Sequence, residues 1–155
     1  MDKNQWEATK AKLHDYCLAQ ATQSIATARA ALEAAQEAGN TETKSSAGDK
    51  YETGRAMMQQ EQEKNKVQLL KAIELKNQLA QLRSGQRNET AGPGSLVITN
   101  HGNFYLSVGL GKVSLEGKIY YAISLQSPVG ELLRGKRVGE EFSFQRKHYT
   151  VMGVI

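Results

Sequence analysis

The chain of 155 residues has few of the features that define several protein classes. It contains one cysteine, Cys17, so no disulfide can form within it. No apolar run approaches the ~20 residues that a membrane-spanning helix needs. The first ten residues also lack the apolar core of a signal peptide. We therefore expect a cytoplasmic protein that does not contact membranes.

Aromatic residues and clustered basic residues are also scarce. Aromatics make up 6% of the chain, which is little for one large core and suits a small globular unit joined to a helical element. The formal net charge is +4, and residues 1–84 carry 12 Lys and Arg against 11 Asp and Glu. Without a dense Lys/Arg cluster, the sequence does not favour a dedicated duplex-DNA-binding protein.

Two long segments have helical patterns. Residues 3–38 are rich in good helix formers and lack Pro and Gly, and Gly39-Asn40 then predicts the helix end. From Asp49 to Arg83, apolar residues recur at spacings of three and four. Because neither helix can bury its apolar stripe alone, we expect an antiparallel coiled-coil hairpin over residues 1–84 with its tip at about 39–50.

Apolar positions indicate which helix faces are buried. In the first segment, Leu18, Ile25 and Leu32 follow one another at intervals of seven. In the second segment, Asp49 and Glu52 form a capping-box-like start to a helix with one buried stripe. The expected stripe consists of Tyr51, Met57, Met58, Val67, Leu69, Leu70, Ile73, Leu75, Leu79 and Leu82.

The remainder of the chain has a different character. Residues 85–94 read as a linker, since glycines and a proline end the helical pattern there. Residues 95–155 are rich in β-branched and aromatic residues, which predicts an antiparallel sheet. One short helix is expected, with Ser127 as its cap, Pro128 at its first position and Gly135 at its end. The fold class is therefore α+β, and we expect this small domain to gain stability by docking on the hairpin base.

One C-terminal segment, ISLQSPVGELLRGKRVGEEFSF (residues 123–144), carries a motif that combines a helix cap, a helix stop and a strand start. It resembles the C-terminal domain of the bacterial Gre transcript-cleavage factors. The layout of the chain, with helices first and an α+β unit second, is also similar to that family. The matching residues are Ser124, Ser127-Pro128, Gly130, Leu133, Gly135-Lys136, Gly139 and Glu140-Glu141.

This resemblance implies an FKBP-like C-terminal domain that docks on RNA polymerase core, while the coiled-coil tip enters the secondary channel. It implies a transcription elongation factor that is not itself an enzyme and at most stimulates RNA cleavage by the polymerase. No stably bound metal or cofactor is expected, beyond Mg²⁺ shared with the polymerase active site. The chain would be a monomer or weak homodimer that contacts RNA indirectly and lies near the nucleic acid. The implied polymerase-binding residues are Ser127, Pro128, Arg134, Lys136 and Arg137.

The tip departs from the family pattern. When that pattern is anchored on Tyr51, Lys44 and Ala47 stand where the family has its paired acids. Asp49 with Glu42 or Glu52 could form an alternative acidic pair, or Asp49 could cap the helix. Alternatively, the protein enters the channel without donating a metal ligand. A different class of function is also open: a Gre-derived coiled-coil adaptor that binds a protein other than RNA polymerase.

Cys17 and His14 lie three residues apart on one expected helix face. They could be imagined as a thiol and its base, or as two metal ligands. Cys17 follows Leu13 on an apolar stripe, however, which favours a cysteine packed within the coiled coil. VGLGK, at residues 108–112, lacks the full spacing of a phosphate loop and is interpreted as a turn or bulge in a strand.

Overall fold

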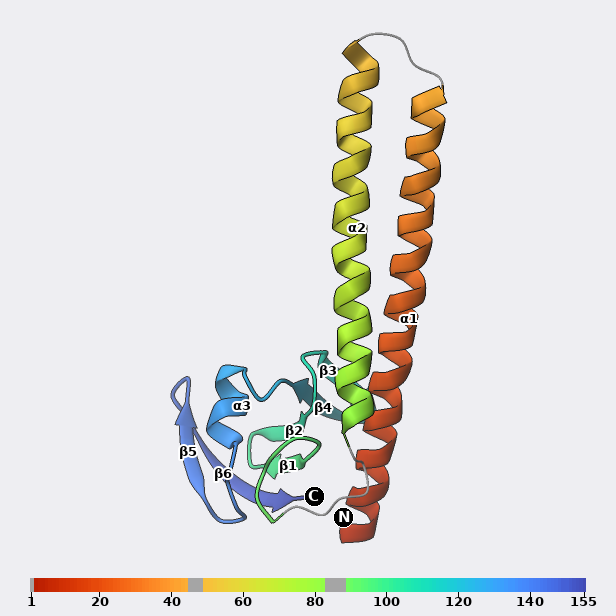
Figure 1. Cartoon of the computed structure of the whole chain (residues 1–155). Helices are drawn as coiled ribbons and strands as arrows, with labels where there is room; N and C mark the ends of the chain where they lie inside the picture. Colours follow the sequence, from red (N-terminus) through yellow and green to blue (C-terminus); the bar gives the residue numbers. More distant parts are fainter. Residues whose placement is uncertain (1, 45–48, 83–88) are drawn as a thin grey trace. The chain divides into compact units, whose positions relative to one another are not determined.

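The computed structural model describes residues 2–44, 49–82 and 89–155, and it describes no side chains for residues 39–53. Two long helices come first, α1 (Lys3–Lys44) and α2 (Asp49–Gln81). They are followed by β1 (Leu96–Thr99), β2 (Gly102–Leu106), β3 (Gly111–Leu115), β4 (Lys118–Ile123), α3 (Pro128–Leu133), β5 (Glu141–Phe144) and β6 (Lys147–Val154) (Figure 1). The described chain is α+β, as predicted.

The chain divides into two compact units. The first combines residues 1–18 with residues 78–155, and the second contains residues 19–77. Helix α1 therefore contributes its first turns to the unit that contains the sheet. Helix α1 also runs to Lys44, past Gly39-Asn40, so the prediction of a helix end at residue 38 is wrong. One glycine inside a helix costs only about 1 kcal/mol relative to alanine, which does not by itself end the helix.

Within the described residues, six strands form one sheet in the order β3-β4-β2-β1-β6-β5. The prediction of a purely antiparallel sheet is wrong, because β2 and β4 pair in parallel. The β3–β4 hairpin places its second strand, rather than its first, beside β2, and this reversal makes β4 run in the same direction as β2. The glycine-rich segment before β3 is a turn, and β3 begins at Gly111 with a φ of 81°.

One face of the sheet packs against α3. Phe104 and Leu106 of β2 point to this face and join Leu133 of α3 in a buried cluster. Phe142 and Tyr149 extend the cluster across β5 and β6, with their rings stacked at a centroid distance of 4.9 Å. This cluster is an apolar core of the first unit, and it fixes α3 on the sheet.

The other face of the sheet packs against the first turns of α1. Leu13, Cys17 and Tyr105 are fully buried there. Tyr105 lies between Phe104 and Leu106 in β2, so its side chain points to the opposite face from theirs. At the edge of this contact, Lys12 forms an ion pair with Glu116 in the β3–β4 turn. Cys17 is packed as predicted, but it packs in the unit that contains the sheet rather than in the helical unit of residues 19–77.

In the second unit, α1 and α2 meet through small and polar residues. Ala21, Ala28 and Ala35 are buried at intervals of seven, whereas the leucine and isoleucine stripe predicted for this helix is only half-buried. The side-chain amide of Gln62 donates to the Ala35 carbonyl oxygen at 3.3 Å. The expected stripe on α2 is wrong at three positions that are exposed: Met57, Val67 and Leu70.

Candidate functional site

The start of α3 is built by two serines that the sequence analysis singled out. Ser127 has an extended backbone (φ −68°, ψ 157°), and its hydroxyl accepts a hydrogen bond from the Gly130 N–H at 3.1 Å. The same hydroxyl donates to the Ser124 carbonyl oxygen at 2.6 Å. Pro128 occupies the first helical position, where its missing N–H has no consequence. Ser127 is therefore the N-cap, as predicted.

Gly130 is required by this arrangement. A Cβ atom at this position would lie 2.1 Å from the Ser124 carbonyl oxygen and 2.8 Å from the Ser127 hydroxyl oxygen. Both distances are below 3.0 Å, a separation that real Cβ atoms essentially never show. The Ser–x–x–Ser–Pro–x–Gly spacing therefore has a steric reason. The Ser124 carbonyl oxygen and the Ser127 hydroxyl occupy the space that the side chain of any residue other than glycine would need at position 130.

The basic residues after α3 follow a tightly held segment of backbone. Arg134 ends the helix, and its N–H donates to the Gly130 carbonyl oxygen at 3.0 Å. Gly135 has a φ of 77°, as expected for a glycine just past a helix end. The Arg137 N–H donates to the Glu140 carboxylate at 3.1 Å. The side chains of Arg134 and Arg137 are exposed and that of Lys136 is half-buried, so the structure presents these cations at the surface.

A polar cleft of about 390 Å³ lies beside residues 124–126, just before α3. Its lining is mostly side-chain amides and hydroxyls, without a charged residue. Ser107 contributes a buried hydroxyl that lies close to the Cys17 thiol. The Ser124 hydroxyl accepts from the Gln126 N–H at 3.1 Å and is thus held in place. The lining residues are Gln78, Gln81, Leu82, Pro93, Ser107, Ser124, Leu125 and Gln126.

The tip residues fall where α1 ends and α2 begins. Glu42 and Lys44 belong to the end of α1, while Asp49 and Glu52 belong to the start of α2. Their side chains lie outside the described residues. The predicted acidic pair and the predicted helix cap at Asp49 therefore stay predictions.

Cys17 and His14 occupy a buried polar layer between α1 and the sheet. A hydrogen bond of 3.0 Å joins the His14 Nδ1 atom to the Tyr105 hydroxyl. Burial raises the pKa of the Cys17 thiol to about 11, and the nearby Ser107 hydroxyl offsets only part of this shift. A thiol with this pKa is protonated at neutral pH and is a poor nucleophile. Burial also raises the pKa of Tyr105. This layer is best explained as structural.

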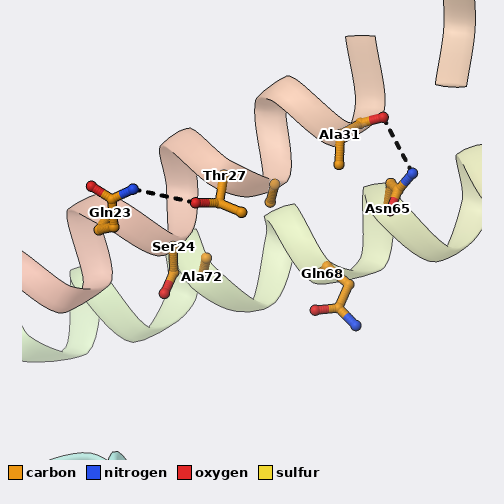
Figure 2. Close-up of a pocket in the computed structure, with 8 residues that line it drawn as sticks. Gln23, Ser24, Thr27, Ala31, Asn65, Gln68 and Ala72 are labelled. Carbon is orange, nitrogen blue, oxygen red and sulfur yellow. Dashed lines mark hydrogen bonds between the residues drawn. The ribbon is translucent and has the colours of Figure 1, made fainter. Parts of the chain in front are cut away.

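The second unit has a groove of about 350 Å³ between its two helices (Figure 2). Its walls consist of small and amide side chains, and the Asn65 amide donates to the Ala31 carbonyl oxygen at 3.3 Å. Gln23 donates to Thr27 at 3.4 Å along α1. None of the lining side chains titrates, so the groove offers no acid–base chemistry.

Sequence reasoning found the serines and the glycine at α3 because they lie within seven residues of one another. It missed the cleft, since Gln78 and Ser107 come from distant segments that only the fold brings together.

No group of three or more potential metal ligands occurs among the described residues. None of the described helices has an apolar stretch long enough to cross a bilayer. No protein-family model, curated protein or solved structure matches this chain.

Proposed function

We propose that this chain is a Gre-like transcription factor that binds RNA polymerase core and modulates backtracking, pausing or RNA cleavage. The observation that carries the proposal is the start of α3. The segment that resembles the Gre motif uses Ser124, Ser127 and Gly130 together in one interlocked cap.

The polymerase-binding surface in this proposal is the exposed side of the α3 segment. Ser127 and Pro128 fix the backbone there, while Arg134 and Arg137 supply exposed cations and Lys136 a half-buried one. The polar cleft lined by the residues just before α3 adds side-chain amides to this surface. This chemistry suits a polar protein surface that carries carboxylates.

The finer fold assignments are part of the same proposal. The domain around α3 is FKBP-like, and α1 with α2 forms an antiparallel coiled-coil hairpin. At 1.5 Å per residue, the 33 residues of α2 give a helix about 50 Å long. A helix pair of that length suits a narrow channel better than a compact binding site.

The tip acts at the polymerase active centre in this proposal. Carboxylates are the ligands that Mg²⁺ prefers, so Asp49 with Glu42 or Glu52 would help hold a shared Mg²⁺ ion there. Lys44 would bring a positive charge to a position that is acidic in the family pattern. The chain has no active site of its own in this account, and any hydrolysis of RNA belongs to the polymerase.

Binding to purified RNA polymerase core, with a known secondary-channel factor as competitor, tests the proposal. We expect competed binding at micromolar concentrations or tighter. Arg137→Glu should weaken binding at least tenfold, because it reverses an exposed charge on the docking surface. Lys112→Glu is the matched control: it makes the same charge change on β3, and we expect it to leave binding unchanged.

Tip variants separate docking from action in the channel. Asp49→Ala and Lys44→Ala should still bind polymerase but should change RNA cleavage or pausing in stalled complexes. Absence of polymerase binding at micromolar concentrations would overturn the proposal and favour the adaptor function. Binding that the channel factor does not compete would place the contact elsewhere on the polymerase and refute insertion of the tip.

A further inference from the structure

Strand β6 is longer than the strand that covers its outer side. β5 pairs with residues 147–150 of β6. The next residue, Val151, bonds to the chain just before β5: its N–H donates to the Glu140 carbonyl oxygen at 2.9 Å, and its carbonyl oxygen accepts from the Gly139 N–H at 2.8 Å. Within the described residues, no strand lies on that side of β6 at residues 152–154, where β6 runs on past β5 (Figure 1).

The β1–β6 ladder shows where the open backbone groups point. Leu96 and Ile155 exchange both of their backbone hydrogen bonds, at 3.0 and 2.9 Å. The register shifts only between Ile98 and Thr99, so the ladder is regular at residues 153–155 of β6. In a regular antiparallel pair, the residues next to a hydrogen-bonded pair direct their N–H and C=O groups away from the partner strand. Val154 therefore directs both groups to the side that has no strand, where they form a template for an added one.

An apolar groove of about 460 Å³ lies against this open stretch. Trp6 of α1 forms part of its wall, and Met152 and Val138 are 59% and 61% exposed. Lys3 also lines the groove, and the acidic residue Glu7 follows Trp6 in the chain, so the charges do not select an occupant. The open backbone does. The other lining residues are Ile98, Gly153, Val154 and Ile155.

The two outermost strands of the sheet carry charged residues. Lys112 lies on β3 and Glu141 on β5, and both side chains are exposed. Natural proteins protect edge strands from pairing with other chains by means of charged residues and proline. Residues 152–154 are Met, Gly and Val and have neither protection. This stretch therefore has the character of an edge that pairs with another segment.

Gly153 gives an independent indication. A glycine inside a strand weakens it and often marks a place where another backbone approaches closely. The fold does not require a glycine here, because its φ lies outside the left-handed region and an added Cβ atom would come no nearer than 3.4 Å to another atom, Cγ1 of Ile98. The space that a side chain would fill is left to the groove.

We propose that this groove binds a short, extended, apolar segment of a partner protein, which adds to the open edge of β6. The backbone of that segment exchanges hydrogen bonds with Val154, and its side chains contact Trp6 and Met152. The groove contains none of the residues of the α3 docking surface. It is thus a second interaction site, and its existence does not depend on polymerase binding.

Hydrogen exchange of the Val154 amide, measured by NMR on the full chain, tests the backbone pairing directly. The probe is a capped synthetic peptide of about seven residues, with alternating valine and threonine and a lysine at each end. Two further versions are N-methylated, each along one edge of the peptide. We expect the unmodified peptide to slow exchange at Val154 at least about tenfold and to leave Lys112 of β3 unchanged. One N-methylated version should keep this effect and the other should lose it, because only one edge of an added strand bonds to β6.

Two glycine variants identify the site. Gly153→Ala fills the floor of the groove and should weaken peptide binding at least about tenfold, while the urea midpoint stays the same or rises. Gly109→Ala is the matched control, because a Cβ atom there would meet no atom within 4 Å, and peptide binding should persist. Gly153→Ala should also leave polymerase binding intact, which keeps failure of this proposal distinct from failure of the proposed function.

Three results would overturn the inference. The first is unchanged exchange at Val154 in millimolar peptide. The second is an equal effect of both N-methylated versions, which would mean that the groove binds side chains without pairing of backbones. The third is slower exchange at Val154 as the protein concentration rises, together with a dimer in sedimentation, which would assign the edge to a second copy of this chain.

Discussion

Replacing Gly130 with alanine should destabilise the sheet-containing unit by about 2–4 kcal/mol. The added Cβ atom would lie 2.1 Å from the Ser124 carbonyl oxygen, which is backbone and cannot rotate away. Relief requires the chain around Ser127 to move, and movement breaks the cap that this serine forms. Loss of a cap costs about 1 kcal/mol, and overpacking of a well-fitted site adds about 1–3 kcal/mol.

Urea denaturation followed by Trp6 fluorescence is the appropriate assay, because Trp6 and Gly130 belong to the same compact unit. Far-ultraviolet circular dichroism alone would mainly report on the long helices. Gly109→Ala is the control, since a Cβ atom there would meet no atom within 4 Å. We expect that control to stay within about 0.5 kcal/mol of the wild type. If Gly130→Ala is equally mild, the packing explanation of the motif is incorrect.

Three further predictions concern the contact between α1 and the sheet. Between pH 9 and about 11 the unfolded Cys17 thiol ionises while the folded thiol, whose pKa is raised, stays protonated, so stability falls as pH rises. The free energy of unfolding, measured by urea titrations, should therefore fall between pH 8 and 10.5, and in Cys17→Ala this fall should be smaller by about 2 kcal/mol. An equal fall in the wild type and the variant would contradict the prediction. Tyr105→Phe removes the hydrogen-bond partner of His14 and should lower the free energy of unfolding at pH 8 by about 1–3 kcal/mol in thermal denaturation. A decrease below about 0.5 kcal/mol would mean that water replaces the hydroxyl. A double-mutant cycle with Lys12→Gln and Glu116→Gln should give a coupling below about 1 kcal/mol, because both side chains are more than half exposed; stronger coupling that persists in high salt would refute a surface ion pair.

Local signals account for what the sequence predicted well. The start of α3 was predicted in detail because cap, proline and glycine are close in sequence. The parallel pairing of β2 with β4 was missed. It depends on which strand of a hairpin lies beside β2, and no local pattern encodes that choice.

Periodicity located the buried side of α1 but chose the wrong stripe. The leucines and isoleucine at positions 18, 25 and 32 repeat every seven residues, and so do Ala21, Ala28 and Ala35. The structure buries the alanines and leaves the larger residues half-buried. Alanine allows the backbones to approach, and Gln62 of α2 can then reach a carbonyl of α1. Hydrophobicity scales rank leucine above alanine, so they favour the stripe beside the contact rather than the contact itself.

The first turns of α1 show why the candidate sites differ in predictability. Sequence periodicity treats residues 3–38 as one uniform helix, yet the fold uses the beginning of this helix to cover a sheet formed from the other end of the chain. Trp6 lines a groove together with Met152, and His14 reaches Tyr105, only through that long-range packing. The motif at α3 is complete within its own segment, so it can be recognised from the sequence alone. The apolar groove between the first turns of α1 and strands β1 and β6 exists only once both ends of the chain have met, and for that reason it has no sequence signature of its own.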